Sequence, residues 1–257
     1  MRPMLGLTFD PASADASAAS VTLVGGGPGD PELITVAGLK ALFSADVVLV
    51  DHLGPVDLLS ELPDHIEVID VATHPHGKTT PQERINELLI EHARAGKRVV
   101  RLKGGDGFVF GRGFEELVAL NEAGISVRVI PGLTSPVSVP ALAGIPVTNR
   151  GVVHEFTVVS GHVPPGHPTS LIEWDALARL RGTLVLLMAV KNAQAIAESL
   201  IAGGRAASTP VAVTTDGSLP TQRTVRTTLG ELGEAIETHA IRPPAIIVIG
   251  EVAGLGV

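Results

Sequence analysis

The sequence predicts an α/β protein of two domains, with a parallel sheet in the N-terminal domain and a mixed sheet in the C-terminal domain. Its 257 residues are long for one domain, since a domain usually has roughly 100–200 residues. Up to Ile130, valine-rich runs alternate with amphipathic helical patterns, which is typical of parallel strands covered on both faces. After Pro131, proline and glycine become frequent and we expect fewer helices between the strands. We therefore expect domains over residues 20–132 and 133–257, preceded by a flexible Ala/Ser-rich tail over residues 1–19.

Short apolar runs rich in valine, isoleucine and threonine are expected to form the strands. In the N-terminal half they are VTLVG (21–25), DVVLVD (46–51), IEVID (66–70), RVVRL (98–102) and SVRVI (126–130). In the C-terminal half they are FTVVS (156–160), TLVLLMA (183–189), PVAVTTD (210–216), QRTVRTTL (222–229) and AIIVIGEVA (245–253).

The helices of the N-terminal half have clear start and stop signals. A helix is expected to begin at Pro31 with Asp30 as its N-cap, because proline suits the first helical position and aspartate accepts bonds from free amides. A second helix follows Thr80 and Glu83, which stand at capping-box spacing, and stops at Gly96. A third pattern, over residues 115–124, leads into the last strand of this half.

Composition narrows the class of protein. Hydrophobic residues make up 45% and charged residues 18%, which predicts globular domains. The absence of cysteine removes disulfides, thiolate metal sites and cysteine nucleophiles. A net charge of −8 repels polyanions such as nucleic acid, and no apolar run reaches the roughly 18 residues of a membrane span. We expect a cytoplasmic protein that binds neither nucleic acid nor membrane.

Two glycine-rich loops follow predicted strands. GGGPGD (25–30) fails the dinucleotide pattern because Asp30 stands where the last glycine is needed. RLKGGDGFVFGRG (101–113) lacks the Gly-Lys-Ser/Thr ending of a phosphate loop and carries Asp106 among its glycines. That carboxylate favours a ligand with a positive or hydroxyl-rich part, and the helix expected near Gly111 offers amides to a carboxylate. An amino acid joined to a ribose meets both requirements.

Metal and hydrolase chemistry are not expected. His74 and His76 have no third ligand nearby in the sequence, so we expect an exposed loop there and no metal site. Ser160, which precedes Gly161 and His162, lacks a nucleophile-elbow pattern.

Taken together and in order, these segments resemble the tetrapyrrole methylase superfamily, and within it most closely the uroporphyrinogen-III C-methyltransferases. The resemblance runs from Val21 to Val252, and its most specific blocks are GPGDPELIT, GGD-x-F-x-FGRG and PG-x-TS…AGIP. It implies the tetrapyrrole methylase fold with a cleft between its two α/β domains, a homodimer and a small tetrapyrrole substrate. It also implies S-adenosyl-L-methionine as methyl donor, with S-adenosyl-L-homocysteine as product.

Position by position, the resemblance assigns mostly small and apolar residues to cofactor contact, which suits an adenosine and a methionine. They are Pro28, Gly104, Gly105, Asp106, Val109, Phe110, Thr134, Ser135, Met188, Gly217 and Ala245.

The implied reaction is methyl transfer to uroporphyrinogen III at C2 and C7, giving precorrin-2. Asp51 matches the aspartate that the family proposes as proton acceptor, although a cap or a pyrrole N–H acceptor would also suit a carboxylate there. Because the substrate carries many carboxylates, we expect Lys103, Arg112 and Arg150 to anchor it. Nothing in the sequence separates the siroheme branch from the cobalamin branch.

Several positions depart from the family pattern on the substrate side. A gap-free count puts Thr73 where the family has a lysine, with Lys78 five residues later. The others are Val50 and His52 around Asp51, Gly107, Leu142 and Asn149. These departures leave open a methyltransferase for another precorrin or macrocycle, or a donor-binding homologue with little activity. The resemblance starts after a short tail, so we expect no separate dinucleotide domain.

Overall fold

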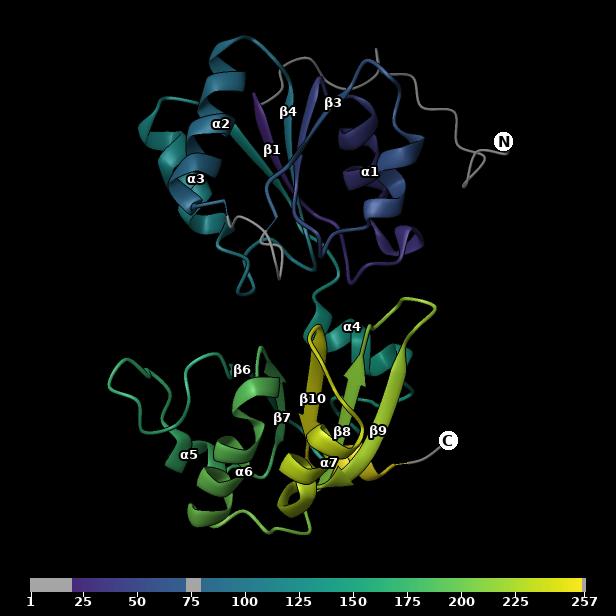
Figure 1. Cartoon of the computed structure of the whole chain (residues 1–257), viewed down its shortest axis with the longest axis vertical. Helices are drawn as coiled ribbons and strands as arrows, with labels where there is room; N and C mark the ends of the chain where they lie inside the picture. Colours follow the sequence, from purple (N-terminus) through teal and green to yellow (C-terminus); the bar gives the residue numbers. More distant parts are fainter. Residues whose placement is uncertain (1–19, 73–79, 256–257) are drawn as a thin grey trace. The chain divides into compact units, whose positions relative to one another are not determined.

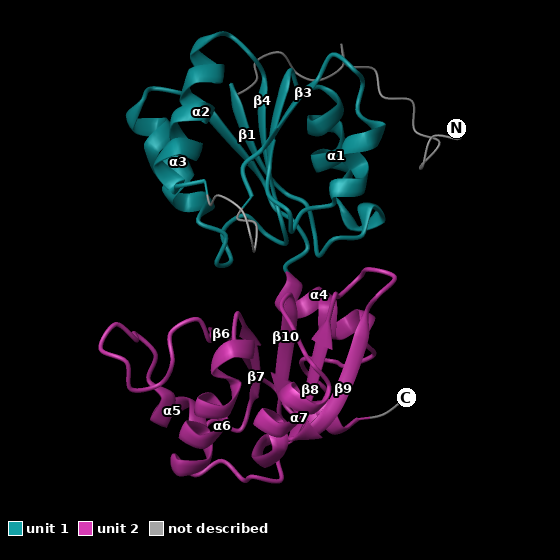
Figure 2. Ribbon diagram, viewed as in Figure 1, with its two compact units in different colours: residues 1–134 teal, residues 135–257 magenta. Residues whose placement is uncertain are grey.

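A computed structural model describes residues 20–72 and 80–255 and forms two compact units, residues 1–134 and 135–257 (Figure 2). The predicted boundary at Gly132 lies two residues before this division. The expected tail, Thr73, His74, His76 and Lys78 fall outside the described residues. In the part of the chain that is described, no helix combines the length and apolarity needed to cross a bilayer.

Unit 1 contains the predicted parallel sheet, with strand order β3-β2-β4-β1-β5 (Figure 1). All four strand pairings are parallel. The strands are β1 (Val21–Gly25), β2 (Val47–Val50), β3 (Glu67–Asp70), β4 (Val99–Lys103) and β5 (Val127–Ile130). The helices are α1 (Val36–Phe43), α2 (Gln82–Arg94) and α3 (Gly113–Glu122), with 3-10 turns at Pro31–Leu33 and Val56–Glu61.

Helices cover both faces of this sheet. Val24, Val100 and Leu102 pack with α1 on one face. Leu23 and Val99 pack with α2 and α3 on the other. This alternation follows from the two-residue period of a strand, and it places every second residue of β4 toward α2 and α3.

One predicted helix start holds for a single turn only, and another is wrong. Asp30 does cap a helix that begins at Pro31, but this helix is a single 3-10 turn. The helix α1 starts separately, with Thr35 as its N-cap, and the Thr35 hydroxyl oxygen accepts a bond from Gly38 N at 3.0 Å. The Thr80–Glu83 capping box does not form, since Pro81 is the N-cap of α2 and no side chain caps it. Gly96 follows the helix end at a φ of +77°, as the stop signal predicted.

Unit 2 contains the predicted mixed sheet, with strand order β6-β7-β10-β8-β9. Only β6 and β7 pair in parallel, and the other pairs are antiparallel. The strands are β6 (Phe156–Ser160), β7 (Thr183–Leu187), β8 (Pro210–Thr215), β9 (Arg223–Thr228) and β10 (Ala245–Ile249). The helices are α4 (Ser135–Leu142), α5 (Trp174–Arg179), α6 (Ala193–Ala202) and α7 (Leu232–Thr238). Short 3-10 turns cover Val190–Asn192, Leu229–Glu231 and Glu251–Gly254.

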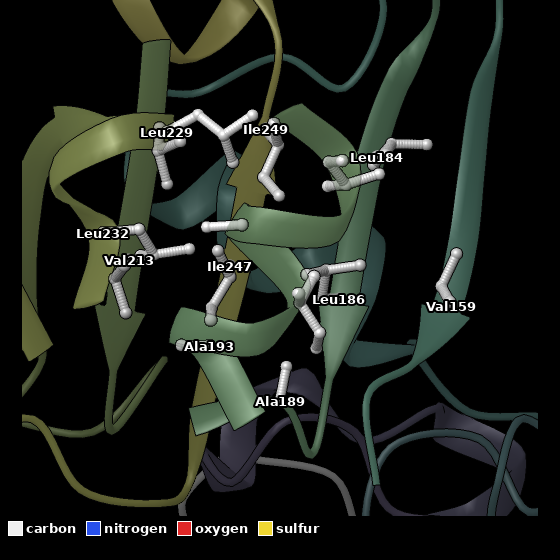
Figure 3. Packing of buried hydrophobic residues seen from close by; sticks show 14 of the residues in the cluster. Val159, Leu184, Leu186, Ala189, Ala193, Val213, Leu229, Leu232, Ile247 and Ile249 are labelled. Carbon is white, nitrogen blue, oxygen red and sulfur yellow. The ribbon is translucent and has the colours of Figure 1, made fainter. Parts of the chain in front are cut away.

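The expectation of fewer helices in the second half is wrong. In the described residues α5, α6 and α7 lie between strands of unit 2, as α1, α2 and α3 do in unit 1. The short, alanine-rich helices gave weaker sequence patterns. They pack on one face of the sheet around Leu186, Ile247 and Leu232 (Figure 3), while α4 packs on the opposite face through Val139.

Three glycines bring the loops after β1, β4 and β5 into backbone contact. A Cβ on Gly132 would lie 2.3 Å from the Gly105 oxygen and 2.5 Å from the Gly25 carbonyl carbon. A Cβ on Gly25 would lie 2.4 Å from Gly132 N. Only glycine permits this approach, so the three strand ends are held together by main chain on main chain.

Replacing Gly132 by alanine is expected to lower the free energy of unfolding by about 1–3 kcal/mol, because the methyl group must displace backbone. Urea denaturation followed by circular dichroism measures the change. Gly54→Ala is the matched control in the same unit, since its Cβ would meet nothing closer than 3.5 Å. An equal effect from the two substitutions would contradict the close-contact explanation.

Candidate active site

The first glycine loop is joined to the second by backbone hydrogen bonds. Gly26 N donates to the Lys103 oxygen at 2.8 Å, and Gly27 and Gly105 exchange bonds of 3.1 and 2.7 Å. Pro28 follows directly and is half-buried. The two loops that carry predicted cofactor residues of unit 1 therefore form one connected ledge at the carboxyl edge of its sheet.

Asp106 shapes the second loop from within. Its Oδ1 accepts bonds from Phe108 N at 2.9 Å and Val109 N at 3.3 Å, and its Oδ2 accepts from Gly132 N at 3.2 Å. The sequence predicted that the Asp106 carboxylate faces a ligand, whereas in the structure both of its oxygens accept hydrogen bonds from amides of the same chain. The resulting loop exposes the side chains of Val109 and Phe110.

Asp51 follows β2 at the same edge of the sheet. Its Oδ1 accepts from Gly104 N at 3.2 Å and Leu53 N at 3.3 Å, and its Oδ2 lies 3.4 Å from an Arg101 nitrogen. The side chain remains 24% exposed. Gly104 crosses close to Leu53, since a Cβ there would lie 2.6 Å from the Leu53 oxygen. Asp51 is therefore held against the second glycine loop while part of its carboxylate faces solvent.

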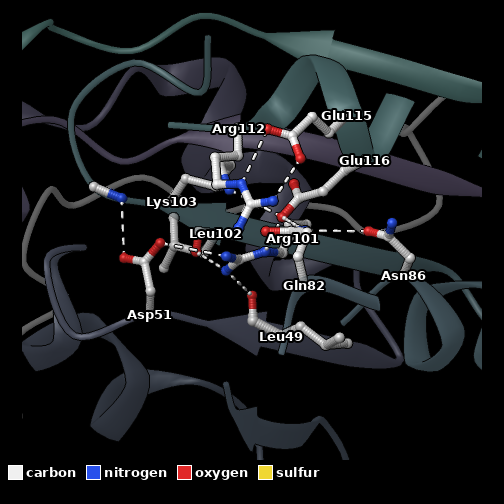
Figure 4. A network of polar contacts seen from close by, with 11 residues as sticks. Leu49, Asp51, Gln82, Asn86, Arg101, Leu102, Lys103, Arg112, Glu115 and Glu116 are labelled. Carbon is white, nitrogen blue, oxygen red and sulfur yellow. Dashed lines mark hydrogen bonds and ion pairs between the residues drawn. The ribbon is translucent and has the colours of Figure 1, made fainter. Parts of the chain in front are cut away.

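A buried charge network lies below Asp51 (Figure 4). Arg101 and Lys103 are each 3% exposed, and both point from β4 toward α3, where Glu116 is fully buried. Glu116 Oε1 accepts from Arg101 Nε at 3.1 Å, Lys103 Nζ at 3.0 Å and Gln82 Nε2 at 3.2 Å. Its Oε2 has no hydrogen-bond partner among the described residues. One carboxylate thus compensates two cations inside unit 1.

The predicted anchor Lys103 needs correction, because its ammonium is inside unit 1 and bound to Glu116. Burial, followed by repulsion from Arg101, lowers the pKa of Lys103 below its ordinary value. A group in this position is not presented to a substrate carboxylate. The alternation of β4, which turns odd-numbered residues toward α3, explains the placement.

The other two predicted anchors are exposed. Arg112 precedes α3 and donates from Nε and Nη2 to the two oxygens of Glu115, at 3.0 and 2.6 Å, which raises the pKa of Arg112. Its charge is already compensated at the surface. Arg150 lies in the turn between α4 and β6 of unit 2.

Unit 2 gathers three predicted cofactor residues at one sheet edge. β10 is antiparallel to β7 and β8, so its first residue, Ala245, lies beside the strand ends that precede Met188 and Gly217. Gly217 also lies against Val139 of α4. Ser135 is the first residue of α4, and Thr134 is the last residue of unit 1.

Backbone strain concentrates in these loops. A positive φ at a residue other than glycine is uncommon and costs of order 1–3 kcal/mol. In the described chain such residues are Phe110, Arg112, Met188, Asp216, Ser218 and Ala240, and all but Ala240 lie in loops with predicted cofactor residues. Strain of this kind clusters at ligand sites, and this observation is independent of any sequence resemblance.

Sequence reasoning missed Arg101 and Glu116. The sequence did contain a signal for Arg101. It lies in the middle of the run VVRLK, and a strand that is covered on both faces would bury this arginine. The histidine pair at 74 and 76 lies outside the described residues. Within residues 20–72 and 80–255, no three His, Asp or Glu side chains lie close enough together to hold a metal ion.

Comparison with known proteins identifies related families. A family model described as Tetrapyrrole (Corrin/Porphyrin) Methylases matches residues 20–233. A uroporphyrinogen-III C-methyltransferase of Methanocaldococcus jannaschii is 44% identical over 237 residues, covering 91% of this chain and 97% of that protein. A siroheme synthase of Neisseria meningitidis is 48% identical over 92% of this chain, and the chain spans 48% of its length.

A solved structure shares the fold. The uroporphyrin-III C-methyl transferase of Thermus thermophilus, complexed with S-adenyl homocysteine, superposes with a TM-score of 0.77 at 40% identity. The match covers 91% of this chain and 98% of that one.

Glu116→Gln is expected to destabilise unit 1 by about 3 kcal/mol or more, because two buried cations lose their carboxylate. The matched control is the neighbouring Glu115→Gln, whose exposed pair with Arg112 contributes about 1 kcal/mol at most. Urea unfolding measures both. Equal stabilities for the two variants would show that Glu116 does not compensate Arg101 and Lys103.

Proposed function

Because the chain belongs to the tetrapyrrole (corrin/porphyrin) methylase family, we propose that it transfers methyl groups from S-adenosyl-L-methionine to uroporphyrinogen III. The observation that carries this proposal is the 44% identity to the M. jannaschii uroporphyrinogen-III C-methyltransferase over nearly the full length of both chains. The proposed sites of methylation are C2 and then C7, which gives precorrin-2. A homodimer and a cytoplasmic location belong to the same proposal, as the resemblance implies.

The residues present fit the methyl donor. In unit 1 the ledge formed by the two glycine loops leaves Gly104 and Gly105 partly exposed near the exposed side chains of Val109 and Phe110, which suits an adenosine or a methionine chain. Pro28, Gly104, Gly105, Asp106 and Thr134 are proposed to contribute from the same unit. In unit 2 the proposal includes Ser135, Met188, Gly217 and Ala245. Met188 is 46% exposed, whereas plain core packing would bury it.

When bound, S-adenosylmethionine supplies a methyl group that is already activated by its sulfonium, so the chain itself chiefly positions the reactants. Methylation of a pyrrole carbon leaves a proton that must be removed from the macrocycle. Asp51 is proposed to accept it, since its carboxylate is partly exposed at the carboxyl edge of the sheet. The bonds from Leu53 N and Gly104 N hold Oδ1 and fix the orientation of the carboxylate.

Acceptor binding requires local positive charge on a chain with a net charge of −8. Arg150 is exposed, and Arg112 is exposed but shared with Glu115. We propose both as contacts for substrate carboxylates and no longer include Lys103, because its ammonium is buried.

Anaerobic incubation of the protein with S-adenosylmethionine and uroporphyrinogen III, followed by mass spectrometry, is expected to yield a product with two added methyl groups. Asp51→Asn is expected to lower the rate about 10²–10⁴-fold while donor affinity stays unchanged, because asparagine keeps an oxygen for Leu53 N and Gly104 N but cannot accept the proton. Asp57→Asn, an exposed carboxylate of the same unit, is the control. Donor binding with no methylated product would refute this acceptor and direct the assay to other precorrins.

Asp106→Ala is expected to weaken S-adenosylmethionine binding about tenfold or more, because the loop loses its bonds to Phe108 N, Val109 N and Gly132 N. Isothermal calorimetry measures the affinity, with Asp57→Ala as the control. Unchanged affinity would mean that the loop keeps its shape without this carboxylate or that it does not contact the donor.

A further inference from the structure

The Arg101 side chain makes polar contacts with several parts of unit 1. Its Nη1 donates to the Leu102 oxygen at 2.9 Å and the Leu49 oxygen at 3.4 Å, which joins β4 to β2. Its Nε donates to Glu116 on α3, and its Nη2 donates to Asp51 Oδ2 at 3.4 Å. One side chain thus joins two strands, one helix and the proposed proton acceptor (Figure 4).

The burial of this guanidinium makes the contact with Asp51 specific. Arg101 is 3% exposed, so its attraction for Asp51 is little screened by solvent. Glu116 accepts from Nε of the same guanidinium and from Lys103 as well. Arg101 therefore lies between two carboxylates, one fully buried and one partly exposed.

The contact also reaches the second glycine loop. Asp51 Oδ1 accepts from Gly104 N while Oδ2 meets Arg101, so the carboxylate bridges the guanidinium and the first residue of the loop. Leu53 N donates to the same Oδ1. Freeing Oδ2 would allow the carboxylate to rotate and would weaken both amide bonds.

We propose that Arg101 is a positioning residue that acts through Asp51, fixing the carboxylate in one orientation toward the acceptor. Glu116 holds the guanidinium in place from the buried side. This inference rests on the proposed function for its catalytic consequence, whereas its structural consequence is separately measurable.

The chain provides a matched control at the opposite ends of the same two strands. Arg98 precedes β4 and binds Asp46, which precedes β2, at 2.7 and 3.1 Å. This pair joins the same segments but is largely exposed and lies at the far edge of the sheet. Arg98→Gln removes an arginine–aspartate contact without touching Asp51.

The kinetic test compares Arg101→Gln, Arg98→Gln, Asp51→Asn and the double variant Arg101→Gln/Asp51→Asn in anaerobic single-turnover assays. We expect Arg101→Gln to lower the methyl-transfer rate about 10- to 100-fold while donor affinity changes less than about threefold. On the Asp51→Asn background, Arg101→Gln should cause no further loss, because its effect passes through Asp51. Arg98→Gln should match the wild type.

A second measurement does not depend on turnover. Amide hydrogen exchange by NMR should show Leu53 and Gly104 exchanging about tenfold faster in Arg101→Gln, while both stay unchanged in Arg98→Gln. Ile247, in the core of unit 2, serves as an internal reference. If Arg101→Gln does not fold, Arg101→Lys keeps a buried cation, removes the forked contact and supports the same comparison.

The outcomes separate the two proposals. If the wild type transfers no methyl group to uroporphyrinogen III, the proposed function fails, and the exchange rates alone decide the inference. Unchanged exchange at Leu53 and Gly104 overturns the inference. An equal rate loss with and without Asp51 also overturns it, since Arg101 would then act by another route.

Discussion

The contact of three backbones at Gly25, Gly105 and Gly132 is the constraint on which the rest of unit 1 depends. It fixes the ends of β1, β4 and β5 against one another without any side chain between them. Asp106 adds a polar connection across the same place by accepting from Gly132 N. Because the loop after β4 is fixed at Gly105 and Asp106, its remaining residues can hold strained backbone, as Phe110 and Arg112 do.

The charges below this ledge follow a second constraint. Two cations on β4 share one fully buried carboxylate, and the remaining counter-charge comes from Asp51, which is partly exposed. Such groups cost free energy to bury, and a purely apolar core would be at least as stable. The cost is offset where the network orients a side chain that is proposed to act at the surface, and the side chain in that position is Asp51.

Much of the fold was predictable because strand signals in this chain are strong. Runs rich in valine and isoleucine, such as VVLV and AIIVI, predicted the positions of the strands. The higher proline and glycine content after Pro131 predicted the change from a parallel to a mixed sheet. Helix starts were less predictable. Asp30 and Thr35 both suit an N-cap, and only tertiary packing decides that a short turn and a separate helix form. Short alanine-rich helices likewise leave little periodic signal.

The candidate site was predictable where the type of a residue implies its chemistry. It was not predictable where the role of a residue depends on the direction in which its side chain points. Lys103 was expected to anchor a substrate carboxylate because of its charge, whereas the register of β4 turns it toward Glu116. Asp106 was expected to face a ligand, whereas in the folded chain both of its oxygens accept hydrogen bonds from nearby amides. The value of Arg101 arises from its contacts on three segments, which are β2 with Asp51 at its end, β4 and α3, and it cannot be read from any one of them.

Glu116 accepts three hydrogen bonds at the single oxygen Oε1, from Gln82, Arg101 and Lys103. This sharing limits which amino-acid substitutions the sequence can accept during evolution. With Asp51 counted, the network holds two cations and two carboxylates, so a neutral replacement at Arg101, Lys103 or Glu116 alone leaves one charge without a counter-charge, and paired steps are favoured. Lineages that replace Glu116 are expected to have replaced Lys103 as well, with Arg101 retained by its contact with Asp51. The interior of this unit should therefore vary by correlated exchange, while its apolar positions vary one at a time.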